Sequence, residues 1–369
     1  MMMTIILLLM LLAIFISLLF IPYLTRKTES FGVSIPEKLY HRADFEHMRK
    51  RYVFFMAILS FVLLSIFGVS SFFIKEDETL LGVTFTVIVV LYLIVSFIIY
   101  LYFHFTMRKI KEKENWSAEK VQKTVVHTKF REEKLTISNW WYVLPALFTI
   151  GLGVMTLLTY DQLPERIPMN YNLAGDVTSW EEKTYGTVLI LPAIQLFLVI
   201  IFLFINIVIA RAKQQVSAGN PKRSIKQNIT FRRRWSIFLY ISLLAIIFMF
   251  TFMQIGDYFF NIPSIFLITL PMIISFGMII GVLILAITTG QGGSRVRTSD
   301  TLDDSVINRE DDRYWKLGQF YVNREDPALF IEKRFGIGWT LNFARPLGWL
   351  SLIGIIVIPF MIIYLLTKF

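Results

Sequence analysis

The sequence predicts an all-α polytopic membrane protein, with about eight transmembrane helices and a small cytoplasmic β-containing module before the last helix. Hydrophobic residues make up 55% of the 369 residues and charged residues 17%, whereas soluble domains hold about 45–50% and about 25%. Eight apolar stretches lack Asp, Glu, Lys and Arg and reach the ~20 residues that a helix needs to cross a bilayer. Lysines and arginines gather in alternate loops, as they do on the cytoplasmic side of membrane proteins.

The predicted spans follow one another along the chain. They are Met3–Leu24, Tyr52–Ile74, Leu80–Thr106, Ser138–Thr159, Thr184–Ala210, Trp235–Ile255, Pro263–Thr289 and Leu347–Thr367. The first span starts with Met-Met-Met-Thr and lacks the basic segment that opens a signal peptide. We therefore expect this span to be retained as a helix.

The distribution of basic residues predicts the orientation of the helices. The basic loops are Thr25–Arg51, Met107–Ile137, Arg211–Arg234 and Gly290–Pro346. Of the chain's 37 Lys and Arg, only Lys75, Arg166, Lys183 and Lys368 lie on the other side. Because loops rich in Lys and Arg stay in the cytoplasm, both termini are expected outside it. The net charge of +10 then indicates topology and contact with anionic lipids, and not nucleic-acid binding.

The longest outer loop, Tyr160–Lys183, contains the pattern L-P-x-x-I-P-x-x-x-N-x-x-G, followed by a lysine eight residues after the glycine. Prolines exclude a helix here, and asparagine and glycine favour turns, so we expect a compact, ordered loop. Its acidic residues, Glu165, Asp176, Glu181 and Glu182, are either ordinary solvated charge or a site for a cation or a basic peptide.

This outer loop resembles the uncharacterised-domain family numbered 1648, over roughly Asn139–Ala210. The residues that carry the resemblance are Leu163, Pro164, Ile167, Pro168, Asn172, Gly175 and Lys183, with Asn170 where the family usually has histidine. The domain also occurs in SdpI-type membrane proteins. The resemblance therefore implies a role in immunity to a secreted toxin and in relaying its presence to a repressor.

A second segment, Asp311–Pro346, is similar to the short module of uncharacterised-domain family 5808. The matching residues include Asp312, Tyr314, Trp315, Gly318, Asn323, Asp326, Pro327, Arg334, Gly336, Gly338, Trp339 and Asn342. We expect Gly318–Asn323 and Ala328–Lys333 to form a hairpin around the turn at residues 323–327, and Val121–Leu135 to add strands to it. The alternative is a module that caps the helices or lies on the membrane surface.

The chain is expected to divide into five parts. They are an N-terminal three-helix region (1–137), a helix pair with the outer loop (138–210), a basic loop with two helices (211–289), the cytoplasmic module (290–346) and the last helix (347–369).

Residues suited to catalysis or metal binding are scarce. There is no cysteine, and His41, His47, His104 and His127 lie outside any H-E-x-x-H pattern. We therefore expect no catalytic residues, no metal site and no cofactor.

Two further groups of polar residues invite a choice of roles. Gln195 and Asn206 are eleven residues apart and fall on one face of a helix, which predicts either contacts between helices or a path for a polar substrate. The basic loop, with Lys222, Arg223, Arg232, Arg233 and Arg234, is expected to bind anionic lipid or, alternatively, an acidic cytosolic regulator.

The function predicted from these features is an immunity-type or signal-sensing receptor in the bacterial cell membrane. Its outer loop would meet an extracellular peptide or toxin, and its inner loops a cytosolic regulator. An uncoupled or partner-driven transporter is the alternative, because no charged residue lies inside a span to couple ion flow. An intramembrane enzyme has the least support.

Overall fold

Seven helices of the part of the chain that the structure describes are long and apolar enough to cross a membrane. The structure is a computed structural model, and it describes residues 2–368 except 75–76, 115, 117–120, 124–132, 173–174, 214, 218–219, 261, 299–305 and 309–310. The long helices are α3 (Ala43–Ile74), α4 (Glu78–Glu114), α5 (Val143–Leu158), α6 (Tyr185–Arg211), α7 (Pro221–Ile255), α8 (Ser264–Thr289) and α9 (Pro346–Leu366). A shorter apolar helix, α1 (Met2–Leu19), precedes them. A 3-10 turn, Asn139–Tyr142, precedes α5 directly, so this span runs over 20 residues from Asn139 to Leu158. The predicted class of membrane protein is confirmed.

The helix ends differ from the predicted spans for simple reasons. The first span is divided into α1 and a short helix, α2 (Ile21–Leu24), because Pro22 lacks an N–H donor and its ring clashes with a carbonyl of the preceding turn. The helices α3 and α4 have 32 and 37 residues. At ~1.5 Å per residue both exceed the ~30 Å hydrocarbon core, so their charged ends project beyond it.

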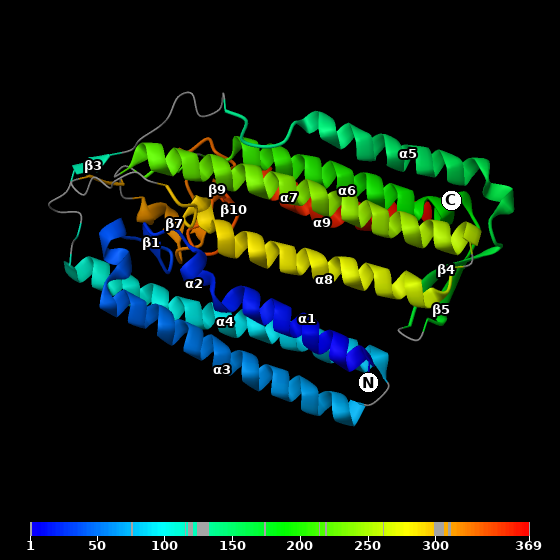
Figure 1. Cartoon of the computed structure of the whole chain (residues 1–369), viewed down its shortest axis with the longest axis horizontal. Coiled ribbons are helices and arrows are strands. Elements are labelled where there is room, and N and C mark those ends of the chain that lie inside the picture. The colour runs from blue at the N-terminus through cyan, green and yellow to red at the C-terminus, as the bar shows by residue number, and fades with distance from the viewer. Residues whose placement is uncertain are drawn as a thin grey trace. The chain divides into compact units, whose positions relative to one another are not determined.

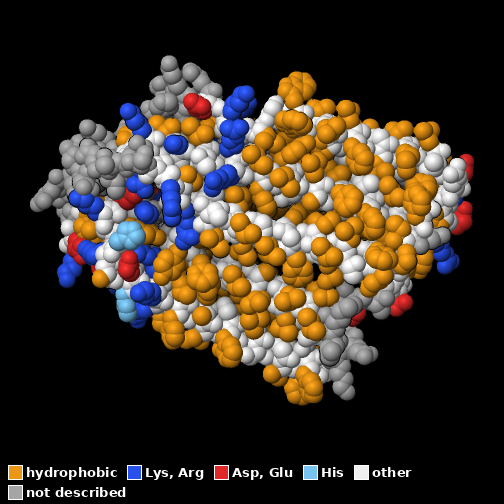
Figure 2. All heavy atoms as spheres, in the orientation of Figure 1, with side chains coloured by type: hydrophobic (Ala, Val, Ile, Leu, Met, Phe, Trp, Pro, Cys, Tyr) orange, Lys and Arg blue, Asp and Glu red, His pale blue; other side chains and the backbone are white. Residues whose placement is uncertain are grey.

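The surface of the helices is apolar. Figure 2 shows hydrophobic side chains covering much of the visible helical face. On α3, Phe61 and Phe72 are 73% and 79% exposed. Water would oppose such exposure over a contiguous surface, whereas lipid tails favour it.

The chain forms two compact units. Unit 1 comprises residues 1–130, 213–231 and 283–344, and unit 2 comprises residues 131–212, 232–282 and 345–369. In unit 1, α1, α3 and α4 pack side by side around buried rings such as Phe15, Phe67 and Tyr92 (Figure 1). In unit 2, α6 packs against both α5 and α9.

Short strands lie between the helices, in two-stranded sheets. The antiparallel pairs are β1 (Glu29–Ser30) with β2 (Val33–Ser34), β4 (Arg166–Tyr171) with β5 (Val177–Glu182), β7 (Trp315–Lys316) with β8 (Phe320–Tyr321), and β9 (Phe330–Glu332) with β10 (Trp339–Leu341). The strand β3 (Val121–Lys123) pairs in parallel with β6 (Val306–Asn308). The ordered outer loop is thus a β-hairpin.

The predicted strand pairing of the cytoplasmic module is wrong. The strand β8 pairs with β7 and not with β9, because the turn lies at Leu317 and Gly318, whose φ angles are +52° and +70°. The strand β9 pairs with β10, across a turn in which Gly336 and Gly338 also have positive φ. The described strand β3 pairs with β6 instead of joining this module, and the rest of that predicted stretch, from 124 to 132, lies outside the described residues.

Candidate functional site

The β4–β5 hairpin is fixed to unit 2 by the apolar residues of its motif. Leu163 and Ile167 are buried, and they pack with Val188 of α6 and with Tyr258 after α7. Burial of these side chains holds one edge of the hairpin against the helices. Pro164 remains exposed between them, and Pro168 lies opposite Trp180 in the strand pairing.

Lys183 closes the base of the hairpin. Its Nζ donates to the carbonyl oxygen of Leu163 at 3.1 Å and to the Glu165 carboxylate at 2.8 Å, and it lies 5.2 Å from the ring centre of Tyr160. The hydrogen bond to Glu165 raises the pKa of Lys183. The motif lysine therefore joins the two ends of the loop while it stays charged.

The tip of the hairpin is built from the motif's asparagines and glycine. The Asn172 side chain accepts from the backbone N–H of Asp176 at 2.8 Å, and Asn170 Nδ2 donates to Ser179 Oγ at 2.7 Å. Gly175 has φ +97°, and a Cβ there would lie 3.2 Å from the Ser264 side chain. Asn170 thus joins β4 to β5 through its side chain.

Most of the motif residues are buried or bond to other residues of the hairpin, whereas a different set of side chains is exposed. Trp180 is 52% exposed and Met169 37% exposed. Asp176, Glu181 and Glu182 are also exposed. The hairpin therefore presents an indole ring beside carboxylates on a frame held from within.

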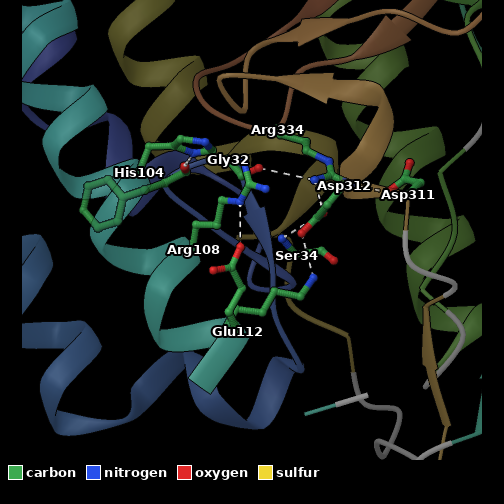
Figure 3. Close-up of polar contacts among 10 residues, drawn as sticks. Gly32, Ser34, His104, Arg108, Glu112, Asp311, Asp312 and Arg334 are labelled. Carbon is green, nitrogen blue, oxygen red and sulfur yellow. Dashed lines mark hydrogen bonds and ion pairs between the residues drawn. The ribbon is translucent and has the colours of Figure 1, made fainter. Parts of the chain in front are cut away.

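A second group of polar residues lies in unit 1, where the loop module, residues 311–344, meets the membrane helices. Arg334 is 2% exposed and forms ion pairs with Asp311 and Asp312. It also donates to the carbonyl of Gly32 at 3.3 Å (Figure 3). Lys111 of α4 lies 2.6 Å from the Asp312 carboxylate. These contacts join the loop module to β1–β2 and to α4.

Neighbouring opposite charges keep Arg334 and Asp312 ionised. Burial alone would lower the pKa of Arg334, but Asp311 and Asp312 raise it above its usual value. Burial would likewise raise the pKa of Asp312, but Arg334 and Lys111 bring it below its usual value. The group is therefore a buried arginine compensated by partly exposed carboxylates, and removal of the arginine should be strongly destabilising.

A neighbouring ion pair extends the set. Arg26 pairs with Glu332, and Asn228 of α7 donates to Glu332 Oε1 at 2.7 Å. Glu29 of β1 is buried near Arg26 and Arg334, and burial raises its pKa to about 7. Glu29 is thus a buried carboxyl that titrates near neutral pH.

Two reverse turns meet at the side of α4. Phe31 and Gly32 of the β1–β2 turn have φ +46° and +76°, and the β7–β8 turn repeats this backbone at Leu317 and Gly318. Tyr100 Oη donates to the Leu317 carbonyl at 2.9 Å, and His104 Nδ1 lies 2.8 Å from the Phe31 carbonyl oxygen. The spacing of four places both side chains on one face of α4.

The centre of the loop module is organised by Asn342. Its Nδ2 donates to the carbonyl of Asn323 at 2.8 Å, and its Oδ1 accepts from the Asn323 N–H at 3.0 Å. Tyr321 Oη donates to Asp326 at 2.7 Å, and Lys213 approaches the same carboxylate at 2.5 Å. The motif residues of the module therefore fold it and attach it to the chain segment before α7.

Two segments of the chain match known protein families. Residues 147–196 match DUF1648, a domain of unknown function. This segment contains the whole β4–β5 hairpin with parts of α5 and α6. Residues 324–349 match DUF5808, a family of unknown function. Both resemblances expected from the sequence are confirmed, and no curated protein and no solved structure matches the chain.

Next to the DUF1648 hairpin, the two intramembrane amides behave differently. Asn206 donates to Asn139 Oδ1 at 2.9 Å and accepts from Ser236 Oγ at 2.6 Å, so it holds helices together. Gln195 is fully buried, and neither of its amide atoms has a hydrogen-bond partner among the described residues. On this face of α6, the Asn206 amide therefore has hydrogen-bond partners, whereas the Gln195 amide has none among the described residues.

The predicted basic loop is wrong from Pro221 onward, because α7 begins there and includes Lys222, Arg223 and residues 232–234. These basic residues also differ in their surroundings. Arg232 is buried and donates to the carbonyls of Ile209 and Ala212, which caps the end of α6. Arg223 approaches Glu37 at 3.5 Å. Lys222, Arg233 and Arg234 are exposed, and only such exposed cations can meet a lipid headgroup or an acidic partner.

Sequence reasoning missed several residues that attach the DUF5808 segment to its surroundings. Gln291 donates from Nε2 to the carbonyls of Lys333 and Gly338 and accepts from the Gly338 N–H. Arg26, Glu29 and Tyr100 were also passed over. Of these residues, only Gln291 could have been found from the sequence, in Gly-Gln-Gly-Gly after an apolar span. A polar side chain among glycines at the end of a helix can reach free backbone groups.

Proposed function

We propose that this chain is a receptor of the immunity or signal-sensing type, whose β4–β5 hairpin binds a cationic peptide outside the cell. The observation that supports this most is the exposed Trp180 beside Glu181 and Glu182, on a hairpin whose motif residues are engaged in holding it rigid. An indole face attracts Lys and Arg as well as apolar side chains, and the carboxylates add charge complementarity. The proposal assigns the chain no catalytic activity.

The other half of the proposal concerns the predicted cytoplasmic side. The exposed cations of the first part of α7, Lys222, Lys226, Arg233 and Arg234, suit an acidic cytosolic regulator. The Lys111–Asp312 ion pair connects the loop module to α4, and the hydrogen bond from Asn228 to Glu332 connects it to the first part of α7. A rigid connection of this kind would let a change in the helices alter the loops that the regulator contacts.

The receptor proposal is tested by peptide binding to the full chain in nanodiscs. The probes are Lys-rich peptides and matched peptides in which every Lys is replaced by Gln. Lys-rich peptides should bind the unchanged protein, and Trp180→Ala or Glu181→Gln/Glu182→Gln should weaken binding several-fold. Thr178→Ala, an exposed and uncharged position on β5, is the matched control. Equal affinity of all variants would refute the hairpin as the binding element.

A transporter is the second candidate, and the Gln195 amide favours it. A buried amide without partners is costly in lipid, and a polar substrate passing along α6 would satisfy it. Counterflow of polar solutes in proteoliposomes, with Gln195→Leu as the test and Asn206→Leu as the structural comparison, separates this function from the first. Substrate exchange that Gln195→Leu abolishes in a stably folded protein would favour transport.

A further inference from the structure

The β7–β8 turn carries an apolar tip that the rest of unit 1 leaves uncovered. Leu317 is 38% exposed and Phe320 39% exposed, although Trp315, Tyr321 and Ile331 of the same module are buried. Lys316, beside Leu317, is exposed as well. The tip therefore combines two large apolar side chains with a flanking cation.

The conformation of the turn is unusual for this sequence. Leu317 and Gly318 both have positive φ, and the Gln319 N–H donates to the Lys316 carbonyl at 3.3 Å, as in a tight two-residue turn. Asn, Asp or Gly normally occupies the place of Leu317 in such turns, because these residues adopt positive φ at little cost. A leucine that is both strained and exposed needs a reason outside the local backbone.

The place of the turn along α4 supplies that reason. The acidic Glu78 opens α4 and must lie outside the hydrocarbon core. From Leu80, ~30 Å of hydrocarbon takes about 20 helical residues, which ends near Tyr100, and a tilted helix would need more residues. Tyr100 donates to Leu317, and the Phe320 ring lies 6.4 Å from that of Phe97. The tip of the turn therefore lies at, or just inside, the edge of the hydrocarbon core in the nearer leaflet.

We infer that the β7–β8 turn is a membrane anchor, which inserts Leu317 and Phe320 among the acyl chains of phospholipids and leaves Lys316 at the phosphate layer. The apolar tip is then covered by lipid, and Lys316 can extend its apolar stem through the interface while its ammonium group meets phosphate. The loop module is thereby held both by α4 and by the bilayer. This inference stands whatever ligand the β4–β5 hairpin binds.

The depth of the turn can be measured directly because the chain has no cysteine. Single cysteines replacing Leu317 or Phe320 are spin-labelled in nanodiscs of phosphatidylcholine and phosphatidylglycerol. Collision rates are measured with oxygen, which concentrates in lipid, and with a water-soluble nickel chelate. Phe61→Cys on the outer face of α3 is the lipid control, and Arg324→Cys, an exposed position of the same module, is the water control.

The anchor predicts that the oxygen-to-nickel ratio at 317 and at 320 resembles that at 61 and is several-fold above that at 324. Ratios at both positions that match the one at 324 would overturn it. If the Leu317 variant fails to fold, the Phe320 variant still reports the depth of the turn, because its side chain lies on the same exposed tip.

Discussion

At the scale of single residues, the shape of unit 1 depends on backbone positions where a side chain has no room. The β1–β2 and β7–β8 turns approach each other so closely that a Cβ on Gly32 would lie 2.5 Å from the carbonyl oxygen of Gly318. Tyr100 fills the remaining space and donates to Leu317. Glycine is required here by the neighbour as much as by its own φ angle.

Gly318→Ala should destabilise the protein by about 2–4 kcal/mol, because the new Cβ is strained at φ +70° and would lie 2.5 Å from Tyr100 Oη. Gly336→Ala is the matched control, since Gly336 has φ +94° but no atom within 4 Å of the added Cβ. Thermal unfolding in detergent should show the larger loss for Gly318→Ala. Equal losses would mean that strain alone, and not the contact with Tyr100, explains the glycine.

A second prediction at this scale concerns Glu29. Its pKa is about 7 in the folded protein, because of burial, against an ordinary value of 4.5. Its contribution to stability is complete below pH 4.5, declines as the unfolded chain ionises first, and is lost as pH rises through 7. Near 1.4 kcal/mol per pH unit, the loss is on the order of 3 kcal/mol.

Glu29→Gln should therefore flatten the fall in unfolding temperature between pH 5 and pH 8. The window lies above the range in which Asp312 and Asp326, whose pKa values are below the usual one, would be protonated. The exposed Glu325→Gln should leave the profile of the unchanged protein as it is. A profile of Glu29→Gln as steep as that of the unchanged chain would contradict the assignment.

At the scale of elements, the loop module is held to unit 1 mainly by buried charge. Arg334 connects residues 311 and 312 to β1–β2. Asn228 connects β9 to the first part of α7, and Lys213, which precedes α7, connects to Asp326 in the loop before β9. Such ions stabilise one arrangement strongly only while each has its partner. The module should therefore detach as a unit when the set is broken.

Arg334→Met should cost about 3–5 kcal/mol, because it leaves Asp311 and Asp312 without their buried cation. Hydrogen exchange should rise over residues 312–344, while the β4–β5 hairpin keeps its protection. Adding Asp311→Asn to Arg334→Met should recover part of the loss, since Asp312 still has Lys111 as its cation, whereas Asp311 forms its ion pair with Arg334. A double variant less stable than Arg334→Met alone would count against this description of the set.

The elements also show which features the sequence could predict. Long apolar stretches without charge predict helices almost independently of context, and α3 to α9 are found where expected. The pairing of β7 to β10 could not be predicted, because the turn at Leu317 lacks the residues usual for it and is held by Tyr100 of a distant helix. The motif of the β4–β5 hairpin could be recognised in the sequence. The structure was needed to show that Lys183 and Asn172 form hydrogen bonds to its backbone. Buried partners such as Arg26 with Glu332 lie too far apart in the chain for spacing to indicate them.

At the scale of the whole molecule, the account depends on charge asymmetry across the membrane. The basic loops predict that the loop module and the start of α7 lie in the cytoplasm and the β4–β5 hairpin outside. The hairpin's exposed tryptophan and carboxylates, and the exposed cations near α7, then face different compartments. A receptor that links an extracellular peptide to a cytosolic regulator requires this arrangement.

The most direct test is the labelling of Thr178→Cys on β5 and Lys222→Cys at the start of α7, both exposed positions, with a membrane-impermeant thiol reagent. In intact cells, the account predicts that the cysteine at 178 reacts at once and that the one at 222 reacts only after the membrane is permeabilised. Reaction at 222 in intact cells, with 178 protected, would contradict it.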